Sequence, residues 1–410
     1  MPRVSVGSEI GRLTAVLVHD PGNELSAVTP ENREAYLYDD IVTLERAQEE
    51  HRRLVAVLER FAEVHHVTAC VAEMLEQPAA RQWLVSRMLD VVPSEPLARR
   101  LLELPAAELV PLLIEGSEEE PGPIAKALNE TGYDLPPLPN LYFTRDVGVV
   151  INEQVVISAM RHGVRWSEEL LVKALFENHP AFAHDGVLYD GTEERRHGYS
   201  LEGGDVHPLR PDLLVLGFSE RSTPAALDHL CELVFAQGRV ADVVVVVLPQ
   251  APTAVHLDMV FTQVDRELCV VYPPHFVGPE RLPVLHRRRT RAMVREMPNF
   301  FAALRAVGLP LEPILCGGQH RIAQDREQWA SACNLFTVRP GVAMGYSRNE
   351  ATLGEMASAG FRVIAAADFL ARDDSLAADD RAVITVDSSE LVRGGGGPRC
   401  MTLPLARESL

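Results

Sequence analysis

A recurring alternation of short, β-branched apolar runs with amphipathic helical patterns constrains the fold of this sequence most. The first run, residues 13–19, predicts a strand, and Pro21-Gly22 closes it with a turn signal. A helical pattern follows over residues 41–61, with apolar positions three and four apart. Residues 64–70 then predict a second strand. This order of elements indicates an α/β fold.

After Pro136-Pro137 the same alternation continues toward the C-terminus. A repeated α/β unit is compatible with an open parallel sheet, a barrel or a propeller, and periodicity alone does not choose among them. The predicted strands are 147–151, 155–159, 213–217, 243–248, 260–264, 268–271, 343–345, 363–364 and 383–385. The predicted helices include 168–178, 223–237, 299–307, 326–333 and 351–359.

Between residues 71 and 132 only helical patterns follow one another. Pro96, Pro105 and Pro123 stand where helices would start, a position that proline tolerates. No strand pattern interrupts these helices. We therefore expect residues 72–135 to form a small helical bundle that is inserted into, or leans on, an α/β body built from residues 1–71 and 136–410.

Size and charge limit the classes of function. The chain has 410 residues, enough for one large domain or two, and is 47% hydrophobic and 24% charged, as in ordinary globular proteins. A net charge of −19 argues against a nucleic-acid partner. We interpret the one basic run, residues 286–291, as a solvated helix start or a loop. An acidic surface mildly favours a cationic small substrate.

The cysteines and the apolar segments bear on the cellular compartment. No CxxC pair occurs among the six cysteines, so reduced thiols in a cytoplasmic protein are expected. The N-terminus has no basic-then-apolar leader, and the longest apolar run, around residues 243–248, is too short to span a bilayer. We therefore expect neither a signal peptide nor membrane insertion.

Cys400 follows four glycines and a proline close to the C-terminus. Glycines let a backbone approach a ligand closely, so this loop could present a reactive thiol. A disordered tail with an inert thiol is the alternative. The apolar residues 401–405 favour the first interpretation because they can pack as a closing strand. Cys231 and Cys269 lie in apolar patterns and are interpreted as structural.

His256 and Asp258 offer an imidazole beside a carboxylate. On a strand, side chains two residues apart share a face, so both would point into one cavity. An exposed pair at a strand end is the plainer interpretation. Glu202 and Asp205 flank two glycines, which also suits a surface turn, and Asp146 could simply pair with Arg145. A metal site would need more ligands at suitable spacing, and His207 and Glu202 form no tight cluster with this pair, so no metal is expected.

This set contains one thiol, one imidazole and several acids, with no Walker loop, no GxGxxG after a strand and no GxSxG. Carboxylates around a nucleophilic cysteine suit a cationic electrophile. A peptide carbonyl would instead require hydrogen-bond donors for the developing oxyanion.

Several blocks of sequence together resemble bacterial arginine deiminase, in that family's order and roughly its spacing. Each block alone is weak, but the ordered set covers almost the whole chain. The blocks are residues 18–25, 29–32, 38–41, 140–146, 202–205, 217–222, 256–258, 326–334, 346–349 and 393–407.

The resemblance implies a five-bladed, pseudo-symmetric α/β propeller, the pentein fold, with a central active site and a helical domain inserted near residues 72–135. It also implies hydrolysis of free L-arginine to L-citrulline and ammonia through an S-alkylthiouronium intermediate, without a cofactor or metal. We expect a cytoplasmic homo-oligomer whose only small-molecule partner in catalysis is L-arginine.

The same resemblance assigns roles to single residues. Cys400 matches the nucleophile, His256 the general acid and base, and Glu202 the acid that orients substrate and histidine. Asp146 and Asp258 match the carboxylates that hold the guanidinium. The residues that match the substrate-binding positions are Arg165 and Arg221 for the carboxylate, Asn140 and Phe143 for the amino-acid end, and Gly394 for a backbone contact.

Two departures from the family pattern bear on the substrate. Many relatives carry an arginine where this chain has Gly395, and residues 330–334 lack the family's usual acidic and glycine residues. Either change could weaken arginine binding or shift preference to a related guanidino compound. The alternatives are an amidinotransferase, a methylarginine or agmatine hydrolase, a catalytically silent arginine sensor and, least favoured, a cysteine protease. Arg165 and Arg221 argue against agmatine, which has no carboxylate.

Overall fold

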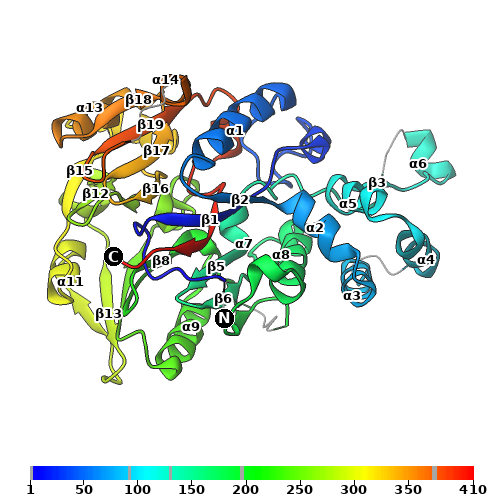
Figure 1. Cartoon of the computed structure of the whole chain (residues 1–410), viewed down its shortest axis with the longest axis horizontal. Coiled ribbons are helices and arrows are strands. Elements are labelled where there is room, and N and C mark those ends of the chain that lie inside the picture. The colour runs from blue at the N-terminus through cyan, green and yellow to red at the C-terminus, as the bar shows by residue number, and fades with distance from the viewer. Residues whose placement is uncertain (1–2, 91–93, 129–131, 194–197, 372–375) are drawn as a thin grey trace.

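The structure is a computed structural model that describes residues 3–90, 94–128, 132–193, 198–371 and 376–410. It has a mixed α/β fold with five sheets of three to five strands and helices packed on the outside (Figure 1). A sixth, two-stranded sheet pairs β3 (Ser117–Glu118) with β4 (Tyr133–Leu135). No helix in the described ranges has the length and apolar character needed to cross a membrane.

Each of the five larger sheets contains the same unit, an antiparallel pair of strands followed by a third strand parallel to the second. In one sheet, β5 (Gly148–Ile151) pairs antiparallel with β6 (Gln154–Ile157). The chain then passes through α8 (Trp166–Asn178) and returns as β7 (Val187–Asp190), parallel to β6. A crossover through a helix is what a parallel pair requires, because a tight turn cannot connect parallel strands.

The other units follow this pattern along the chain. One joins β8 (Val206–Arg210), β9 (Leu213–Phe218), α9 (Pro224–Gln237) and β10 (Asp242–Val247), and β13 (Val284–Arg288) and β14 (Arg295–Met297) extend its sheet. The next joins β11 (Phe261–Gln263), β12 (Leu268–Val271), α10 (Pro273–Phe276), α11 (Phe300–Ala306) and β15 (Glu312–Leu315). After α12 (Arg321–Trp329) come β16 (Phe336–Arg339), β17 (Val342–Tyr346), α13 (Glu350–Ser358), β18 (Arg362–Ala365), α14 (Ala366–Ala371) and β19 (Ala382–Val386).

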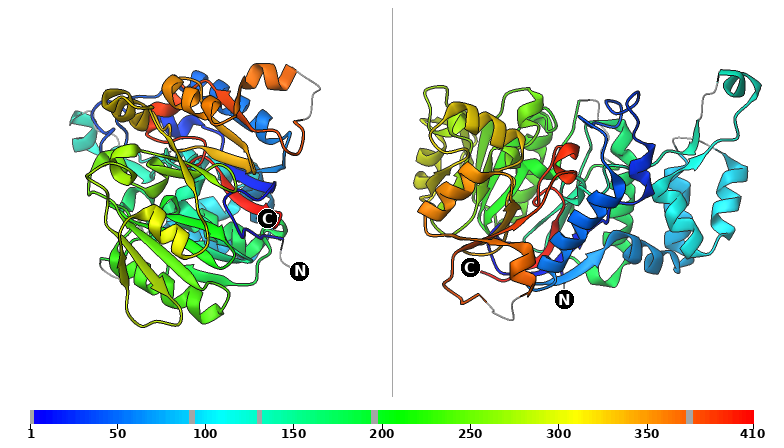
Figure 2. Two further views of the ribbon diagram at one scale, coloured as in Figure 1. Left: turned by 90° about the vertical axis from the view of Figure 1, so that its left-hand side faces the viewer. Right: turned by 90° about the horizontal axis from the view of Figure 1, so that it is seen from above.

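The fifth unit brings the two ends of the chain together. β20 (Leu403–Arg407) pairs antiparallel with β1 (Leu13–Val18), and β1 pairs parallel with β2 (Glu63–His66) after α1 (Leu44–Leu58). The C-terminal strand is therefore the first strand of this sheet, with Leu403 opposite Leu17. Figure 2 shows β1 and β20 side by side in the middle of the molecule.

A run of helices extends to one side of the sheets (Figure 2, right). Pro96 and Pro123 lie in the first turn of their helices and Pro105 caps the next, as predicted. The apolar faces of the first four of these helices belong to one core with β5, β6 and β20, whereas the last helix has no buried residue. These helices are α2 (Val67–Leu75), α3 (Pro78–Met88), α4 (Glu95–Glu103), α5 (Ala106–Glu115) and α6 (Pro123–Leu128).

Three sequence-based predictions about elements are wrong. The second strand ends at His66, and residues 67–70 begin α2 because their apolar side chains Val67, Cys70 and Val71 follow a helical rather than a two-residue period. The basic run begins within β13, where exposed acids on α9 pair with Arg287. Residues 72–135 also contain strands β3 and β4, which are too short to give a periodic signal.

Candidate active site

The turn that precedes the first strand of each unit carries a polar residue into the centre of the molecule. Asp146 comes two residues before β5, Glu202 precedes β8, Asp258 precedes β11, Asn334 precedes β16 and Cys400 precedes β20. Hydrogen bonds and ion pairs join these side chains directly or through His256, so the turns meet even though the residues are far apart in sequence. All five side chains are buried.

Hydrogen bonds hold the Cys400 sulfur in a defined position. Asn334 Nδ2 donates to Cys400 Sγ at 3.1 Å, and Asn334 Oδ1 accepts from the Cys400 backbone N–H at 3.0 Å. The thiol donates to Asp258 Oδ2 at 3.6 Å. Burial raises the pKa of Cys400 well above its ordinary value, and the carboxylates of Asp258 and Asp146 raise it further. The resting side chain is therefore a neutral thiol.

His256 forms an ion pair behind the sulfur. Its Nε2 lies 2.8 Å from Glu202 Oε2, and its Nδ1 lies 3.7 Å from Asp146 Oδ1. Burial lowers the pKa of His256, but Asp146, Glu202 and Asp205 outweigh this effect and raise it to about 9. Burial raises the pKa of Glu202, but Arg221 and His256 bring it down to about 2. At neutral pH this pair is an imidazolium and a carboxylate.

The prediction that His256 and Asp258 share one face of a strand is wrong. His256 caps a short 3-10 helix, Leu257–Met259, that contains Asp258. His256 lines the pocket, whereas Asp258 is fully buried and is not among the lining residues. Both side chains still reach the site because this tight turn precedes β11.

In each of the two predicted guanidinium-binding carboxylates, one oxygen accepts a hydrogen bond from an arginine of the protein. Asp146 Oδ2 accepts from Arg165 Nη1 at 2.7 Å, and Asp258 Oδ2 accepts from Arg399 Nη1 at 2.7 Å. The other oxygen of each carboxylate is buried and has no hydrogen-bond partner among the described residues. A buried carboxylate oxygen without a donor is costly, so these two atoms are available for a ligand that carries N–H groups.

Arg165 and Arg221 differ in how many of their N–H groups already donate hydrogen bonds to the protein. Arg165 is buried, and besides Asp146 its Nε donates to Glu168 Oε2 at 2.9 Å. Its Nη2 donates to the backbone carbonyls of Asn140 and Phe143. Arg221 contacts Glu202 Oε2 at 3.5 Å through Nη1, and its Nε has no partner among the described residues. Arg221 therefore has a donor to offer a ligand.

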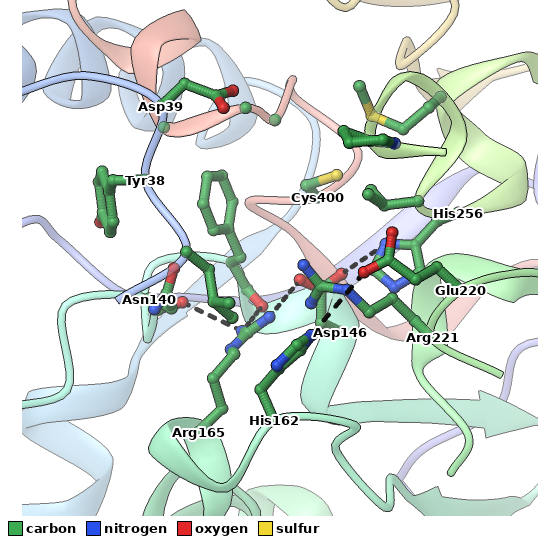
Figure 3. A pocket seen from close by; sticks show the side chains of 18 of the residues that line it. Tyr38, Asp39, Asn140, Asp146, His162, Arg165, Glu220, Arg221, His256 and Cys400 are labelled. Atoms are coloured by element: carbon green, nitrogen blue, oxygen red, sulfur yellow. Dashed lines mark hydrogen bonds and ion pairs between the residues drawn. The ribbon is translucent and has the colours of Figure 1, made fainter. Parts of the chain in front are cut away.

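These groups open into one pocket of about 260 Å³ (Figure 3). Cys400, His256, Arg165 and Arg221 line it, with Arg221 close to His256 and Arg165 on the side of Asn140. Asn140 and Phe143 line it, with the Asn140 amide donating to the Tyr36 carbonyl at 2.9 Å. The lining also includes Glu34, Leu37, Tyr38, Asp39, His162, Glu220 and Gly395.

The glycines before Cys400 allow the loop to lie directly on aromatic rings. A Cβ at Gly394 would lie 1.8 Å from Tyr142 Oη and 3.1 Å from Phe143 Cζ. Gly395 has a φ of 83°, in the left-handed region that favours glycine. The glycine run therefore belongs to a packed loop and not to a disordered tail.

Several site residues were not identified from the sequence. Asn334 was noted only within a family block, and Arg399, Glu168, His162 and Glu220 were not singled out. Arg399 lies next to Cys400 and is itself fully buried, which its charge does not suggest. Asn334 directly follows the predicted helix 326–333, and a single amide there carries little information.

One group of possible metal ligands occurs among the described residues, and it lies inside this site. Asp146, Glu202 and His256 have ligand atoms within 4.8 Å of one another. His256 Nε2 and Glu202 Oε2 are already bound to each other, and Arg221 also contacts that oxygen. A raised histidine pKa further disfavours metal binding, since a metal requires neutral imidazole.

Fold and site together define the class of protein: an α/β enzyme of the guanidine-modifying type. The family model described as arginine deiminase matches residues 34–407. An arginine deiminase of Listeria welshimeri is 32% identical to this chain, with 99% of each chain covered. One of Rhodococcus opacus strain B4 is also 32% identical, with 99% of this chain and 98% of the relative covered. The chain belongs to the arginine deiminase family.

Solved structures with a similar fold have much lower sequence identity. The N-terminal domain of ArgZ, an arginine dihydrolase from cyanobacteria solved with its product, has a TM-score of 0.54 at 17% identity, covering 96% of this chain and 97% of that chain. A dimethylarginine dimethylaminohydrolase, solved as an adduct with S-methyl-L-thiocitrulline, has a TM-score of 0.52 at 13% identity, covering 95% and 99%. These comparisons support the mixed α/β fold.

Proposed function

We propose that this enzyme hydrolyses free L-arginine to L-citrulline and ammonia through a covalent intermediate on Cys400. One observation carries the proposal: a buried thiol, an imidazolium and the Asp146 carboxylate line one pocket, and Asp258 lies against the thiol as a second carboxylate. Each carboxylate has one oxygen without a hydrogen-bond partner among the described residues. A guanidinium supplies the N–H donors and the positive charge that such a set lacks. Membership of the arginine deiminase family supports the same reaction.

Substrate binding activates the thiol in this scheme. A guanidinium that donates to Asp146 and Asp258 neutralises the two carboxylates that raise the pKa of Cys400. Its positive charge then lies beside the sulfur, so the thiol releases its proton to solvent and the thiolate forms against the guanidinium carbon. Paired charge-assisted hydrogen bonds also hold this carbon in line with the sulfur.

The thiolate attacks the guanidinium carbon and forms a C–S bond. His256, protonated in the resting site, gives its proton to a terminal nitrogen, whose C–N bond breaks to release ammonia. The S-alkylthiouronium that remains is attacked by a water, and neutral His256 takes the water proton. The C–S bond then breaks, the hydroxyl proton of the adduct passes to the sulfur, and citrulline leaves with the resting thiol restored. Glu202 keeps the imidazole oriented throughout.

The remaining predicted residues serve the amino-acid end of the substrate. Arg221, with its unpartnered Nε, binds the substrate carboxylate, and Arg165 assists while it orients Asp146. Asn140 and Phe143 line the amino-acid end, and the backbone of Gly394 contacts the substrate.

We also propose how the repeated units are arranged, and in which compartment and assembly the enzyme acts. The five repeated units would form the blades of a pseudo-symmetric propeller built from residues 1–71 and 136–410, with residues 72–135 as an inserted helical domain. The enzyme would act as a cytoplasmic homo-oligomer.

A second candidate is another guanidine-modifying hydrolase, or an amidinotransferase, with a shifted substrate preference. The observation in its favour is that three acids, Glu34, Asp39 and Glu220, line the pocket, and that Asp39 lies beside Gly395. This region has no side chain from position 395 to bind a carboxylate. Burial raises the pKa of Asp39 above its ordinary value.

Product analysis tests both candidates. Purified protein is assayed for citrulline and ammonia with arginine, agmatine, methylarginine, and arginine plus ornithine. We expect turnover of arginine alone, and a loss of several orders of magnitude in kcat for Cys400→Ser. Cys70→Ser, at another buried cysteine, is the matched control and should keep activity. A second guanidine formed from ornithine would establish the transferase instead, and an active Cys400→Ser would refute the covalent mechanism.

A further inference from the structure

A second cavity lies at the far end of β20 from Cys400. Its volume is about 370 Å³, and it is lined by the N-terminal segment, the end of β8 and the last residues of the chain. Four arginines line it in a chain whose net charge is −19.

Arg407, the last residue of β20, is buried with donors unused. Its side chain is 5% exposed, and Nη1 donates to the Gly11 carbonyl at 2.7 Å. Its Nε and Nη2 are buried and have no hydrogen-bond partner among the described residues. The Phe336 ring stacks on the guanidinium at 5.2 Å, which fixes its plane. Buried charged donors without acceptors are rare in native proteins because they are costly.

The other lining arginines show how many positive charges remain unpaired. Arg210 is saturated by Asp212 and by two backbone carbonyls. Arg239 pairs with Glu153, whose carboxylate also lines the cavity. The exposed Arg266 guanidinium has no side-chain hydrogen bond or ion pair within the described ranges. Among the residues that the structure describes, Arg407 and Arg266 therefore remain as two cations with no hydrogen bond or ion pair to a carboxylate.

Gln263 adds a polar group to the same wall. Its Oε1 is buried without a partner, while its Nε2 donates to the Asp265 carbonyl at 3.0 Å. The oxygen and nitrogen of an amide can exchange places by rotation of the side chain, so Gln263 can present either to a ligand. Burial, helped by Arg399, lowers the pKa of Arg407 to about 10 despite the nearby Glu9, as expected for a guanidinium that lacks a close anion.

We propose that this cavity is a binding site for a small oxyanion, the phosphate or carboxylate group of a metabolite, held by Arg407 and Arg266. Guanidinium groups bind such groups through two parallel N–H···O hydrogen bonds, and Arg407 has two free N–H positions. The site is separate from the proposed reaction, so its existence does not depend on which guanidine is the substrate.

Calorimetric titration of the full chain with inorganic phosphate, and separately with succinate, tests the proposal. Without substrate present, we expect saturable binding of at least one anion. Arg266→Ala and Arg407→Gln should each raise its Kd by roughly tenfold to hundredfold, the effect of losing one charge-assisted hydrogen-bonding group. The exposed Arg321→Ala, in α12, removes an equal charge elsewhere and should leave the Kd unchanged. Binding of phosphate or of succinate shows whether the site takes a phosphate or a carboxylate group.

Absence of binding for both anions would overturn the proposal. So would binding or thermal stabilisation of equal size in the wild type and in both variants, because phosphate stabilises many proteins through general exclusion from their surfaces. If Arg407→Gln does not fold, Arg266→Ala decides the outcome alone, since Arg266 is exposed and its loss disturbs no core contact.

Discussion

Asn334 contacts the candidate nucleophile from two sides, at the sulfur and at the backbone N–H. A donor at 3.1 Å stabilises a thiolate more than a thiol because the hydrogen bond becomes charge-assisted. We expect Asn334→Ala to lower kcat by roughly tenfold to hundredfold, since such a bond contributes about 1.5–3 kcal/mol. Single-turnover kinetics measures this change.

Alkylation of Cys400 by iodoacetamide separates this role from a purely structural one. The rate of alkylation should fall with kcat in Asn334→Ala while the unfolding curve stays close to that of the wild type. Wild-type alkylation and turnover in this variant would show that Asn334 only packs against the loop.

The charge state of His256 makes stability depend on pH. Its folded pKa of about 9 lies above the ordinary value of 6.5, so protons stabilise the folded state. The stabilisation is fully present below pH 6.5 and is lost as pH rises to about 9. For Glu202 the folded pKa of about 2 lies below 4.5, so its contribution is lost as pH falls from 4.5 toward 2.

Urea unfolding between pH 6 and pH 9.5 checks the histidine part of this prediction. The difference in free energy of unfolding between the wild type and His256→Asn should shrink steadily across that interval. His275→Asn is a suitable control because the pKa of His275 is lowered to about 4, so this histidine stays neutral throughout. A difference that did not vary with pH would mean that His256 is not protonated in the folded enzyme.

At the scale of elements, the loop before β20 must approach aromatic side chains too closely for any Cβ at Gly394. Since the added atom would lie 1.8 Å from Tyr142 Oη, Gly394→Ala has to displace the loop that carries Cys400. A displacement of about 1 Å costs roughly 100-fold in rate, so we expect kcat/KM to fall by at least that factor. Gly354→Ala, in α13 with no atom within 4 Å, should keep full activity and gain about 0.5–1 kcal/mol of stability.

Elements were predicted well where the hydrophobic period was sustained. Every strand predicted from 147 to 385 overlaps an observed strand, and the apolar residues 401–405 contribute to β20. Helices α8, α9, α11 and α13 are also confirmed, and α12 begins five residues earlier than expected. The predictions of short elements were wrong. The strand predicted over residues 64–70 is the four-residue β2, and the strand predicted for His256 and Asp258 is a turn with a short 3-10 helix. Local propensity says little over such lengths.

At the scale of the whole molecule, a buried ion network joins the ends of the chain to the site. Arg399 binds Asp258 and makes two hydrogen bonds to Glu9, which also lies 3.7 Å from Arg145. Arg399→Met would leave Glu9 and Asp258 buried with less compensating charge. We expect a loss of about 3–5 kcal/mol in the free energy of unfolding, measured in urea. Adding Glu9→Gln should recover part of it.

A surface variant gives the comparison for this network. Arg321→Ala breaks an exposed ion pair and should cost less than about 1 kcal/mol. An equally small loss in Arg399→Met would show that the buried network contributes no more than that surface pair.

The sequence by itself determined the α/β class, most strands and the chemical character of the site. These properties depend on local periodicity and on the presence of particular residue types, which a single chain displays directly. The family resemblance from ordered blocks, which the comparisons confirm, added the expected reaction.

Only the tertiary structure decided which residues meet. The pairing of β20 with β1 brings Cys400 into the centre, and the repeated turns bring Asn334 to its sulfur. The structure also showed that Arg165 and Arg221 differ. Arg165 donates to Glu168 and Asp146, whereas Arg221 Nε has no hydrogen-bond partner among the described residues. Partners of this kind are chosen by packing between segments hundreds of residues apart, and no local pattern in a sequence records which side chain a buried charge will find.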